Sequence, residues 1–506
     1  MKITLIELSV PDTSAIGVRS LSAYLKKAGY SISIIFLANG GHKTPSGQIQ
    51  YPDKVVEQII SLCRGSDLIG LSFLSSGFHR AVQITKNVKQ YMNVPVIWGG
   101  IHATVETEQC LEYADGVCRG EGEEAMLDLV DRMKSGRNYY NTENFCFKKD
   151  GHIIQNSVRP LIQDLDLLSF LDYEPEADHY ALIQKQNEIH RLSVELQKNF
   201  LTPKRGRADI GFQAIYTTMM SRGCPHICSY CFHSLYRPMY KDQNYLRKRS
   251  AENVISELSR FRTNYDFNGA VWFADDDFTA MPIKDIEYFA TLYKQKIGLK
   301  FFCLGSPTTI TEQKLEILTD AGLSYFVFGV QTGSNKTKKV FHRSFSNDLI
   351  IKQARTINKF KAKIPRPYYD FILDNPWETE EDEIETLNLI MQIPRPSQLA
   401  LSSFRYFPGS VLYDTARKEG KLDTQSSEPY SGEFWRLRGK YSTFLIFLYA
   451  YYKFPRILIK LLAGKKLFSL LNRKAFNPFY SIFFKISEKE RHLRMIITQF
   501  IRYKFT

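Results

Sequence analysis

The sequence is poor in cysteine and has no long hydrophobic run. Its 506 residues include 8 cysteines, too few for a secreted scaffold held by disulfides, so we expect a reduced, cytoplasmic setting. The longest uncharged aliphatic and aromatic run, Tyr441 to Tyr452, is shorter than the ~20 residues that span a bilayer. The apolar stretch at the amino terminus is interrupted by Glu7 and lacks a cleavage site. Neither a signal peptide nor a transmembrane helix is therefore predicted.

Acidic residues are scarce at the carboxyl end. From Ser431 to Thr506 there are 16 Lys and Arg against 3 Glu and no Asp, so this tail holds +13 of the net charge of +14. It also contains 18 aromatic residues. This composition favours helices that either pack on the rest of the protein or make peripheral contact with an anionic membrane, at its inner face. Nucleic acid is not expected, because the tail is more aliphatic than an RNA-binding arm.

The first 137 residues alternate short apolar runs with amphipathic segments. Runs of this kind, with no charge in their interior, are typical of parallel strands buried on both faces. The pattern predicts a doubly wound α/β domain of the Rossmann or flavodoxin type. The predicted strands are ITLIEL, ISIIFL, LIGLSFL, PVIWGG and DGVCRG, and the predicted helices are Ile16–Lys27, Asp53–Cys63, Phe78–Tyr91, Val105–Tyr113 and Glu123–Lys134.

Small and polar residues follow three of these strands. Ligands of doubly wound sheets bind beyond the carboxyl ends of the strands, and small residues there let the backbone approach a bulky group. The alternative is that they only form tight turns between strand and helix. The candidate ligand-binding residues are Ser72, Ser75, Ser76, Gly99, Gly100, His102, Gly120 and Glu121.

A second α/β region follows a connector at 138–212. Six further strand and helix pairs run from 213 to 420 without reversal, which predicts a partial (β/α)6 barrel of the TIM type with its site on the carboxyl-end loops. The strands are AIYTTMM, GAVWFAD, KFFCLG, SYFVFGV, PYYDFIL and QLALSSF. The acidic string Glu378 to Glu385 is expected to fill the first turn of a helix. A basic, aromatic helical region, 421–506, closes the chain.

Three cysteines share one short loop after the first strand of this barrel. In SRGCPHICSYCFHS, Cys224, Cys228 and Cys231 have C-x3-C-x2-C spacing. Three thiolates can hold three irons of an iron–sulfur cluster and leave the fourth iron open. A structural zinc with His226 or His233 as fourth ligand is the alternative. The five dispersed cysteines are interpreted as ordinary buried thiols.

This loop, with Tyr230 before its last cysteine, resembles the signature of the radical S-adenosylmethionine (SAM) superfamily. The preceding α/β domain is similar to the cobalamin (B12)-binding domain that many members carry, and the whole resembles class B radical SAM methyltransferases. The resemblance covers roughly Met1 to Gly420. Its further motifs are WGGIHAT, RGEGEEA, RKRSAENVISEL, FADDDF, GVQTGS, DFILDNPWET and FPGSVLYDTARKEG.

The resemblance implies three cofactors: a 4Fe–4S cluster, SAM and cobalamin. The open iron would chelate SAM, and electron transfer would release a 5′-deoxyadenosyl radical able to take hydrogen from an unactivated carbon. Cobalamin, methylated by a second SAM, would deliver the methyl group. The protein would position these groups and exclude water.

The resemblance also implies roles for particular residues. The cluster would be held by Cys224, Cys228 and Cys231. Many relatives have Glu in place of Gln331 and Lys in place of the His342-Arg343 pair, and the first domain lacks the D-x-H-x-x-G frame of a histidine ligand to cobalt. His102 is therefore expected either to face the corrin or to pack inside the domain. SAM would contact Tyr230, Asp275, Asp276, Asp277, Gln331 and Ser334, although at least one of the three aspartates is expected only to cap the following helix. The candidate ligand-binding residues of the first domain would line the cobalamin site.

We therefore expect a cobalamin-dependent radical SAM enzyme that methylates an unactivated carbon of a small or lipid-like substrate. A cyclase or rearranging enzyme with the same cofactors is the first alternative. An RNA methylthiotransferase is less favoured, because a second cysteine triad and a terminal RNA module are not evident. A non-catalytic cobalamin- or metal-binding sensor is the alternative of another class. The expected partners are the substrate and a reductant such as flavodoxin or ferredoxin.

Overall fold

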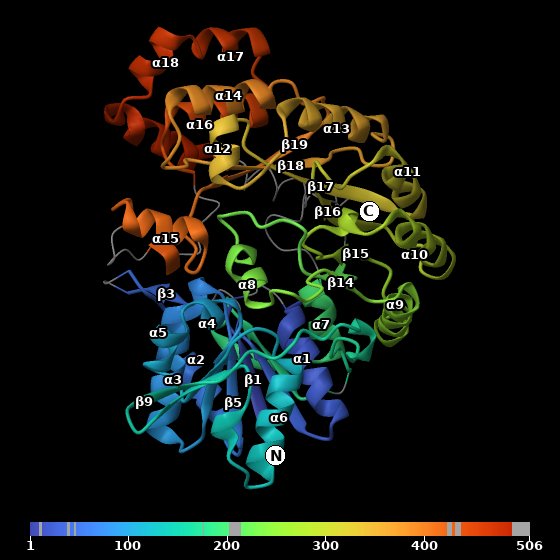
Figure 1. The fold of residues 1–506 in the computed structure, drawn as a ribbon, viewed down its shortest axis with the longest axis vertical. Helices are drawn as coiled ribbons and strands as arrows, with labels where there is room; N and C mark the ends of the chain where they lie inside the picture. Colours follow the sequence, from blue (N-terminus) through green and yellow to red (C-terminus); the bar gives the residue numbers. More distant parts are fainter. Residues whose placement is uncertain are drawn as a thin grey trace. The chain divides into compact units, whose positions relative to one another are not determined.

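The structure is a computed structural model, drawn as a ribbon in Figure 1. It describes residues 1–9, 13–37, 41–44, 47–175, 177–201, 214–422, 428–430 and 437–487. Contacts between residues divide the chain into two compact units. Unit 1 comprises Met1–Thr202, Ala214–Asn268 and Tyr406–Gly432; unit 2 comprises Pro203–Gln213, Gly269–Arg405 and Glu433–Thr506. This division assigns the cysteine loop to the same unit as the first domain.

Unit 1 is built on a nine-stranded sheet in the order β11-β10-β2-β1-β5-β6-β7-β8-β9. Its five central strands are parallel, as predicted. In order along the chain they are arranged 2-1-3-4-5, the flavodoxin-like order, whose switch point lies between β1 and β5. The five strands are β1 (Lys2–Glu7), β2 (Ser31–Phe36), β5 (Leu68–Ser72), β6 (Val96–Gly99) and β7 (Gly116–Cys118).

Helices cover both faces of this sheet (Figure 1). Ile6 and Ile69 belong to a core cluster with residues of α2 and α3, whereas Leu5 and Leu68 belong to a second cluster with residues of α1 and α6. Alternate residues of each strand thus enter opposite cores, which is why the interior positions of these strands carry no charge. The helices α1 (Ile16–Lys27), α2 (Asp53–Cys63), α3 (Phe78–Tyr91) and α6 (Glu123–Lys134) have the predicted bounds.

One predicted helix is divided in two. The expected helix Val105–Tyr113 is replaced by α4 (Ile101–Val105) and α5 (Thr107–Leu111). Glu106 between them has non-helical angles, φ −121° and ψ 50°. Thr107 Oγ1 donates to the carbonyl oxygens of Ala103 and Thr104 at 3.0 and 3.3 Å, and such bonds compete with the regular helical ladder.

The connector is more regular than the sequence analysis expected. It extends the first sheet at both edges with β8 (Phe145–Lys149), β9 (His152–Gln155), β10 (His179–Ile183) and β11 (Glu188–Arg191), and ends in α7 (Val194–Leu201). The β8–β9 hairpin turns at Asp150-Gly151, where both φ angles are positive. An Asp-Gly pair between two short strands is a hairpin signal that the sequence analysis missed.

Further elements of unit 1 precede and follow the cysteine loop along the chain. They include the first predicted barrel strand and the first barrel helix. Their bounds are β3 (His42–Lys43), β4 (Ile49–Gln50), β12 (Ile215–Thr218), β13 (Ser221–Arg222), α8 (His233–Met239), β14 (Arg247–Lys248), α9 (Ala251–Tyr265) and α15 (Val411–Lys418).

Unit 2 contains five parallel strands in chain order, and one or two helices follow each of the first four. The predicted repeating β/α pattern is confirmed. The strands are β15 (Ala270–Phe273), β16 (Phe301–Gly305), β17 (Leu323–Gln331), β18 (Tyr368–Leu373) and β19 (Gln398–Ser403). The helices between them are α10 (Ile283–Lys296), α11 (Glu312–Ala321), α12 (Asn335–Val340), α13 (Asn347–Lys359) and α14 (Glu380–Ile390).

The acidic string lies where it was predicted. Glu380, Glu381, Asp382 and Glu383 occupy the first turn of α14, where carboxylates complement the helix dipole. Thr379 and Asp382 form a reciprocal capping box, which satisfies two backbone N–H groups. The string is therefore explained by helix formation.

From residue 437 on, the described part of the tail is mainly helical and belongs to unit 2, whereas 421–422 and 428–430 belong to unit 1. It comprises α16 (Tyr441–Tyr451), α17 (Arg456–Leu462), α18 (Lys465–Leu471) and a helical segment at 477–487. Residues 423–427, 431–436 and 488–506 of the predicted tail lie outside the described residues. Within the described residues, no helix has the length and apolar character needed to cross a membrane.

Candidate functional site

The cysteine loop begins with a close backbone contact. Gly223 has φ +96°, and a Cβ there would lie 2.2 Å from the carbonyl oxygen of Tyr245, so only glycine fits. Cys228 is buried, while Cys224 and Cys231 are partly exposed. The backbone turns between Cys228 and Cys231, with an N–H···O distance of 2.9 Å.

A second segment of unit 1 holds the far side of this loop. The backbone N–H of Leu412, in α15, donates to the carbonyl oxygen of Ser229 at 3.0 Å. Val411 N–H lies 3.3 Å from Ser234 Oγ. The FPGSVLY motif therefore supports the cysteine loop, which gives that stretch of sequence a local structural role.

The donor set of the loop suits an iron–sulfur cluster, because thiolates are its usual ligands. Burial raises the pKa of Cys63 and of Cys118 to about 12, so these dispersed thiols stay protonated and inert. In the described part of the chain, no three His, Cys, Asp or Glu side chains are already gathered as a metal site. The three cysteines therefore remain predicted ligands, on loop spacing and chemistry.

The histidines proposed for zinc occupy different surroundings. His233 is buried, and its Nδ1 lies 2.7 Å from Tyr245 Oη. Its ring also packs on Phe232, with centroids 4.1 Å apart. His226 is only partly buried. The contacts of His233 orient its ring within the local aromatic packing.

The carboxyl ends of β5 and β6 form tight turns. Gly100 has φ +90°, and a Cβ there would lie 2.9 Å from the carbonyl oxygen of Phe73. Gly99 is more open, since its Cβ would meet only Cys118 Cβ at 3.9 Å. Gly100 thus forms a tight turn between strand and helix, which was the alternative to a ligand-binding role. Gly99 leaves space at the carboxyl edge of the sheet. Ser72 is partly exposed beside them.

His102 packs inside the domain. Its side chain is fully buried, and its Nδ1 lies 3.0 Å from Ser75 Oγ. Its ring packs near Phe78 and Tyr430, at centroid distances of 5.1 and 5.9 Å. Burial lowers the pKa of His102 to about 4, so the imidazole is neutral at physiological pH. Of the two expectations for His102, facing the corrin or packing inside the domain, the structure shows the second. This arrangement fits a corrin bound without a histidine ligand.

The turn after β7 is occupied by the segment that follows the cysteine loop. Arg247 donates from Nη2 to Glu121 Oε1 at 2.8 Å and from Nη1 to Oε2 at 3.0 Å. A Cβ on Gly120 would lie 2.0 Å from Tyr240 Oη. The carboxylate of Glu121, predicted to bind cobalamin, is thus engaged by a buried guanidinium.

A second ion pair lies next to this one. Arg222, two residues before Cys224, donates from Nη2 to Glu123 Oε1 at 2.6 Å. Burial raises the pKa of Glu123, but the charge of Arg222 outweighs it, so the pKa falls to about 2. Sequence reasoning missed both arginines, because their partners lie about 100 residues away and nothing local marks the pairing.

The three aspartates after β15 differ from one another. Asp275 and Asp277 are buried, and Asp276 is exposed. Asp277 Oδ1 accepts from Thr279 Oγ1 at 2.8 Å and from Thr309 Oγ1 at 3.0 Å. Asp277 precedes a short 3-10 turn and makes no side-chain capping bond to it. Its carboxylate instead joins two neighbouring strand ends, since threonine hydroxyls satisfy it.

The two predicted SAM contacts after β17 are also unlike. Ser334 is buried and caps α12, and its hydroxyl donates to Asp382 Oδ1 at 2.5 Å. Gln331 has φ +74° at an irregularity between β17 and β18. A left-handed non-glycine residue costs on the order of 1–3 kcal/mol and is typical of functional sites. Gln331 therefore remains the stronger candidate of the two.

Sequence reasoning missed Asp370, on the next strand. It is opposite Gly329 of β17 and Ala400 of β19, so small residues flank it. Burial raises the pKa of Asp370 to about 7. A lone acid inside a predicted strand was the signal. The neighbouring rings of Trp272, Phe302, Tyr325 and Tyr368 follow one another across four strands, with centroid separations of 5.7, 5.8 and 5.5 Å.

Two cavities in unit 1 lie elsewhere. One, of about 210 Å³, is lined by residues that include Lys26, Asp172, Tyr216 and Arg260. The other, of about 30 Å³, is lined partly by Arg222. Neither lining includes a loop cysteine or a predicted cobalamin residue. The candidate site is thus defined by strand ends and the cysteine loop.

Comparison with protein families identifies both regions. A B12 binding domain matches residues 4–130, and the radical SAM superfamily matches residues 218–390. An uncharacterized methyltransferase of Pyrococcus horikoshii is 24% identical over 373 residues, covering 72% of this chain and 72% of that protein.

Two further comparisons concern an enzyme and a fold. The anaerobic magnesium-protoporphyrin IX monomethyl ester cyclase of Rubrivivax gelatinosus is 25% identical over 331 residues, and the match covers 62% of this chain but 51% of the cyclase. The radical SAM methyltransferase TsrM of Kitasatospora setae, solved with cobalamin and a 4Fe–4S cluster bound, has a TM-score of 0.60 at 13% identity, covering 86% of this chain and 85% of TsrM. At that identity the likeness shows a shared fold.

The two matched regions are the two predicted from the sequence, in the same order, and the cysteine loop lies inside the second. The chain therefore combines a B12 binding domain with a radical SAM domain, and it is a radical SAM enzyme with cobalamin, SAM and a 4Fe–4S cluster as its cofactors.

Proposed function

We propose that this enzyme transfers a methyl group to an unactivated carbon of a small or lipid-like substrate. One observation carries the proposal: the cysteine loop and the carboxyl edge of the B12-binding sheet belong to one compact unit. Arg222 and Arg247, on either side of the loop, pair with Glu123 and Glu121 at that edge. A radical centre and a corrin would thus be held by the same part of the chain.

Each cofactor has a set of residues that could hold it. Cys224, Cys228 and Cys231 supply the thiolates for the cluster, and the open edge at Gly99 and Ser72 suits a flat corrin. When bound, the cluster with SAM supplies a hydrogen-abstracting radical and the corrin supplies a methyl group. The chain itself binds and orients these groups and excludes water from them.

Unit 2 would provide the SAM and substrate contacts. The amide of Gln331 and the carboxyl of Asp370 lie on neighbouring strands and can hydrogen-bond ribose hydroxyls or an ammonium group. Aromatic rings along β15 to β18 offer an apolar surface to a hydrophobic substrate. The buried Asp277 and the capping Ser334 would support the strand ends that carry these contacts.

The named relatives support two outcomes. The cyclase of Rubrivivax gelatinosus acts, by its name, on a tetrapyrrole ester, and a bacteriochlorophyllide d C-8(2)-methyltransferase of Chlorobaculum tepidum is 21% identical over 472 residues. A hydrophobic ring substrate is therefore a reasonable choice for a first assay. The alternative is a cyclase or rearranging enzyme that uses the same cofactors without methyl transfer.

The test is an anaerobic assay with methyl-labelled SAM, a chemical reductant and candidate substrates. We expect labelled methyl in the product together with 5′-deoxyadenosine. Cys228→Ala should abolish both, whereas Cys63→Ala, which removes a thiol outside the loop, should retain both. Full activity in Cys228→Ala would contradict the cluster assignment. A product formed without label would favour the cyclase alternative.

Cofactor content separates the enzyme from a non-catalytic sensor. After anaerobic expression with cobalamin, iron and cobalt are measured in the purified protein. Iron and cobalt in the wild type, and loss of iron alone in Cys228→Ala, would support the proposed sites. Zinc in place of iron would favour the sensor. Flavodoxin or ferredoxin as natural reductant, and contact of the tail with a membrane, are further parts of the proposal.

A further inference from the structure

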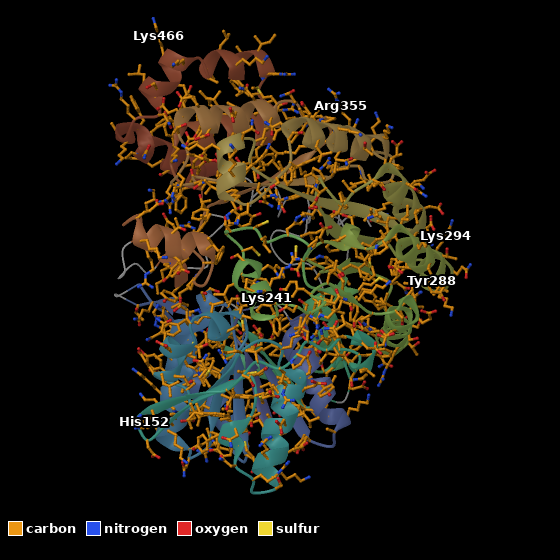
Figure 2. All side chains as sticks on the ribbon, viewed as in Figure 1. His152, Lys241, Tyr288, Lys294, Arg355 and Lys466 are labelled. Carbon is orange, nitrogen blue, oxygen red and sulfur yellow. The ribbon has the colours of Figure 1, made fainter. Side chains whose placement is uncertain are left out.

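The outer helices of unit 2 carry positive charge without any negative partner in their own segment. Residues 437–487 contain ten Lys and Arg and no Asp or Glu. The eight from Lys453 to Lys485 are all exposed. Lys466 projects away from the ribbon in Figure 2. Such a segment has a strong positive potential, which favours an anionic surface as its partner.

The same helices expose large apolar side chains. In the described part of the chain, eleven of nineteen exposed large hydrophobic residues lie in 437–487. Ile457 is 74% exposed and Leu461 66%, on α17; Phe479 is 62% exposed and Ile486 61%, in the helical segment 477–487. Soluble proteins rarely gather so many exposed apolar residues without a binding partner.

These residues form faces, because each helix also has an inner side. In 477–487, Tyr480 and Phe484 are buried, at i and i+4, whereas Phe479, Ile482 and Ile486 are exposed, at i, i+3 and i+7. The segment thus has two apolar faces, and the described part of the chain covers only one of them. A helix that is apolar on both sides needs a second apolar environment.

The inner side fixes these helices in place. Tyr480 packs on Phe444 of α16 with ring centroids 5.2 Å apart, and Phe468 of α18 packs on Tyr441 at 5.5 Å. Tyr441 Oη donates to the carbonyl oxygen of Leu462 at 3.1 Å. Helix α16 is therefore buried by packing within unit 2, as one of the two alternatives for the tail expected. The outer faces of the neighbouring helices form a preformed surface.

We propose that α17, α18 and segment 477–487 form a docking surface for an anionic lipid bilayer. Exposed Ile, Leu and Phe side chains would enter the interface while Lys and Arg contact lipid phosphates. RNA would use the charge but leave the aliphatic residues in water, and a second copy of the chain would bring two positive surfaces together. The proposal deepens the membrane contact proposed above and does not depend on the reaction catalysed.

The test is flotation of the full-length protein with vesicles of phosphatidylcholine alone or mixed equally with phosphatidylglycerol. We expect binding only to the anionic vesicles, and its loss in high salt. Lys465→Glu/Lys466→Glu should raise the lipid concentration for half binding by roughly tenfold or more. The matched control, Lys352→Glu/Arg355→Glu, makes the same change on the exposed face of α13 and should bind as wild type.

Apolar variants give the second arm. Ile457→Ser/Leu461→Ser/Ile482→Ser removes exposed side chains, so its thermal midpoint should not fall, yet binding should weaken roughly tenfold or more. Absence of binding to anionic vesicles, or equal binding by wild type and both variants, would overturn the proposal. So would binding only to RNA or self-association through this surface. Because the variants lie outside the reaction site, a failed docking test leaves the methyl-transfer assay unaffected.

Discussion

The pairing of Glu121 with Arg247 makes the sharpest prediction about the candidate site. The sequence places Glu121 among the cobalamin contacts, whereas in the structure the Arg247 guanidinium engages both of its oxygens and Arg222 Nη1 lies 3.4 Å from Oε1. The Arg247 side chain is 2% exposed. Removing its partner leaves a buried charge without compensation, which costs about 3–5 kcal/mol. Glu121→Gln keeps one acceptor oxygen, so we expect a loss at the lower end, about 3 kcal/mol.

The effect should appear without any cofactor. For a unit of this size, a loss of about 3 kcal/mol lowers the thermal midpoint by roughly 6–12 °C. Circular dichroism of the cofactor-free protein would measure it. Arg247→Met combined with Glu121→Gln should recover part of the loss, since replacing both partners of a buried pair is often neutral. The single variants and the double variant together give the coupling energy.

The result that would refute this reasoning is also specific. If Glu121 acts mainly as a cobalamin contact, Glu121→Gln will leave the midpoint of the cofactor-free protein unchanged and raise the dissociation constant for cobalamin. If it holds the turn in place, stability falls first, and cobalamin binding weakens only because the folded fraction falls. Titration at a temperature well below both midpoints separates the two cases.

Two further predictions concern titration. Burial raises the pKa of Asp370 from 3.8 to about 7, so its contribution to stability is complete below pH 3.8 and is lost as pH rises through 7. The free energy of unfolding of Asp370→Asn should therefore rise relative to that of the wild type by about 2–4 kcal/mol between pH 4 and 8. Thermal midpoints that change in parallel with pH in the two proteins would contradict this. Burial lowers the pKa of His102 to about 4, so the visible spectrum of bound cobalamin should not change between pH 5 and 8. Electron paramagnetic resonance of the reduced cobalt should show no protein nitrogen ligand, either in the wild type or in His102→Asn.

Helix bounds were predictable because their signals are local. The apolar spacing and first-turn acids of α2 and α6 identify their starts, and a basic residue followed by glycine marks the end of α6. These segments do not determine the order of the strands in the sheet, but parallel strands buried on both faces can be connected in only a few orders. The strands of the connector were missed because each is only four or five residues long, and two of them, β9 and β11, are edge strands.

The candidate site was predictable in position and less so in chemistry. A strand end indicates where Glu121, Asp277 and Ser334 lie. It does not indicate whether their polar atoms are already satisfied by residues 30 to 130 positions away. In the structure Arg247, Thr309 and Asp382 satisfy them. Long-range partners of this kind depend on packing, and a single sequence carries no trace of them.

That distinction separates supporting residues from candidate ligand contacts. A polar group bonded within the protein gains little by turning to a ligand, because the partner it leaves behind loses its own hydrogen bond. Within the described residues, the side chains of Gln331 and Asp370 have no such hydrogen bond to the protein. A Cβ on Gly329 would lie 3.2 Å from Gln331 Nε2, and Gly329 is also opposite Asp370. The amide of Gln331, whose backbone is left-handed, and the carboxyl of Asp370, whose pKa is raised, therefore both lie next to Gly329. This pair is where a SAM or substrate contact in unit 2 should be sought first.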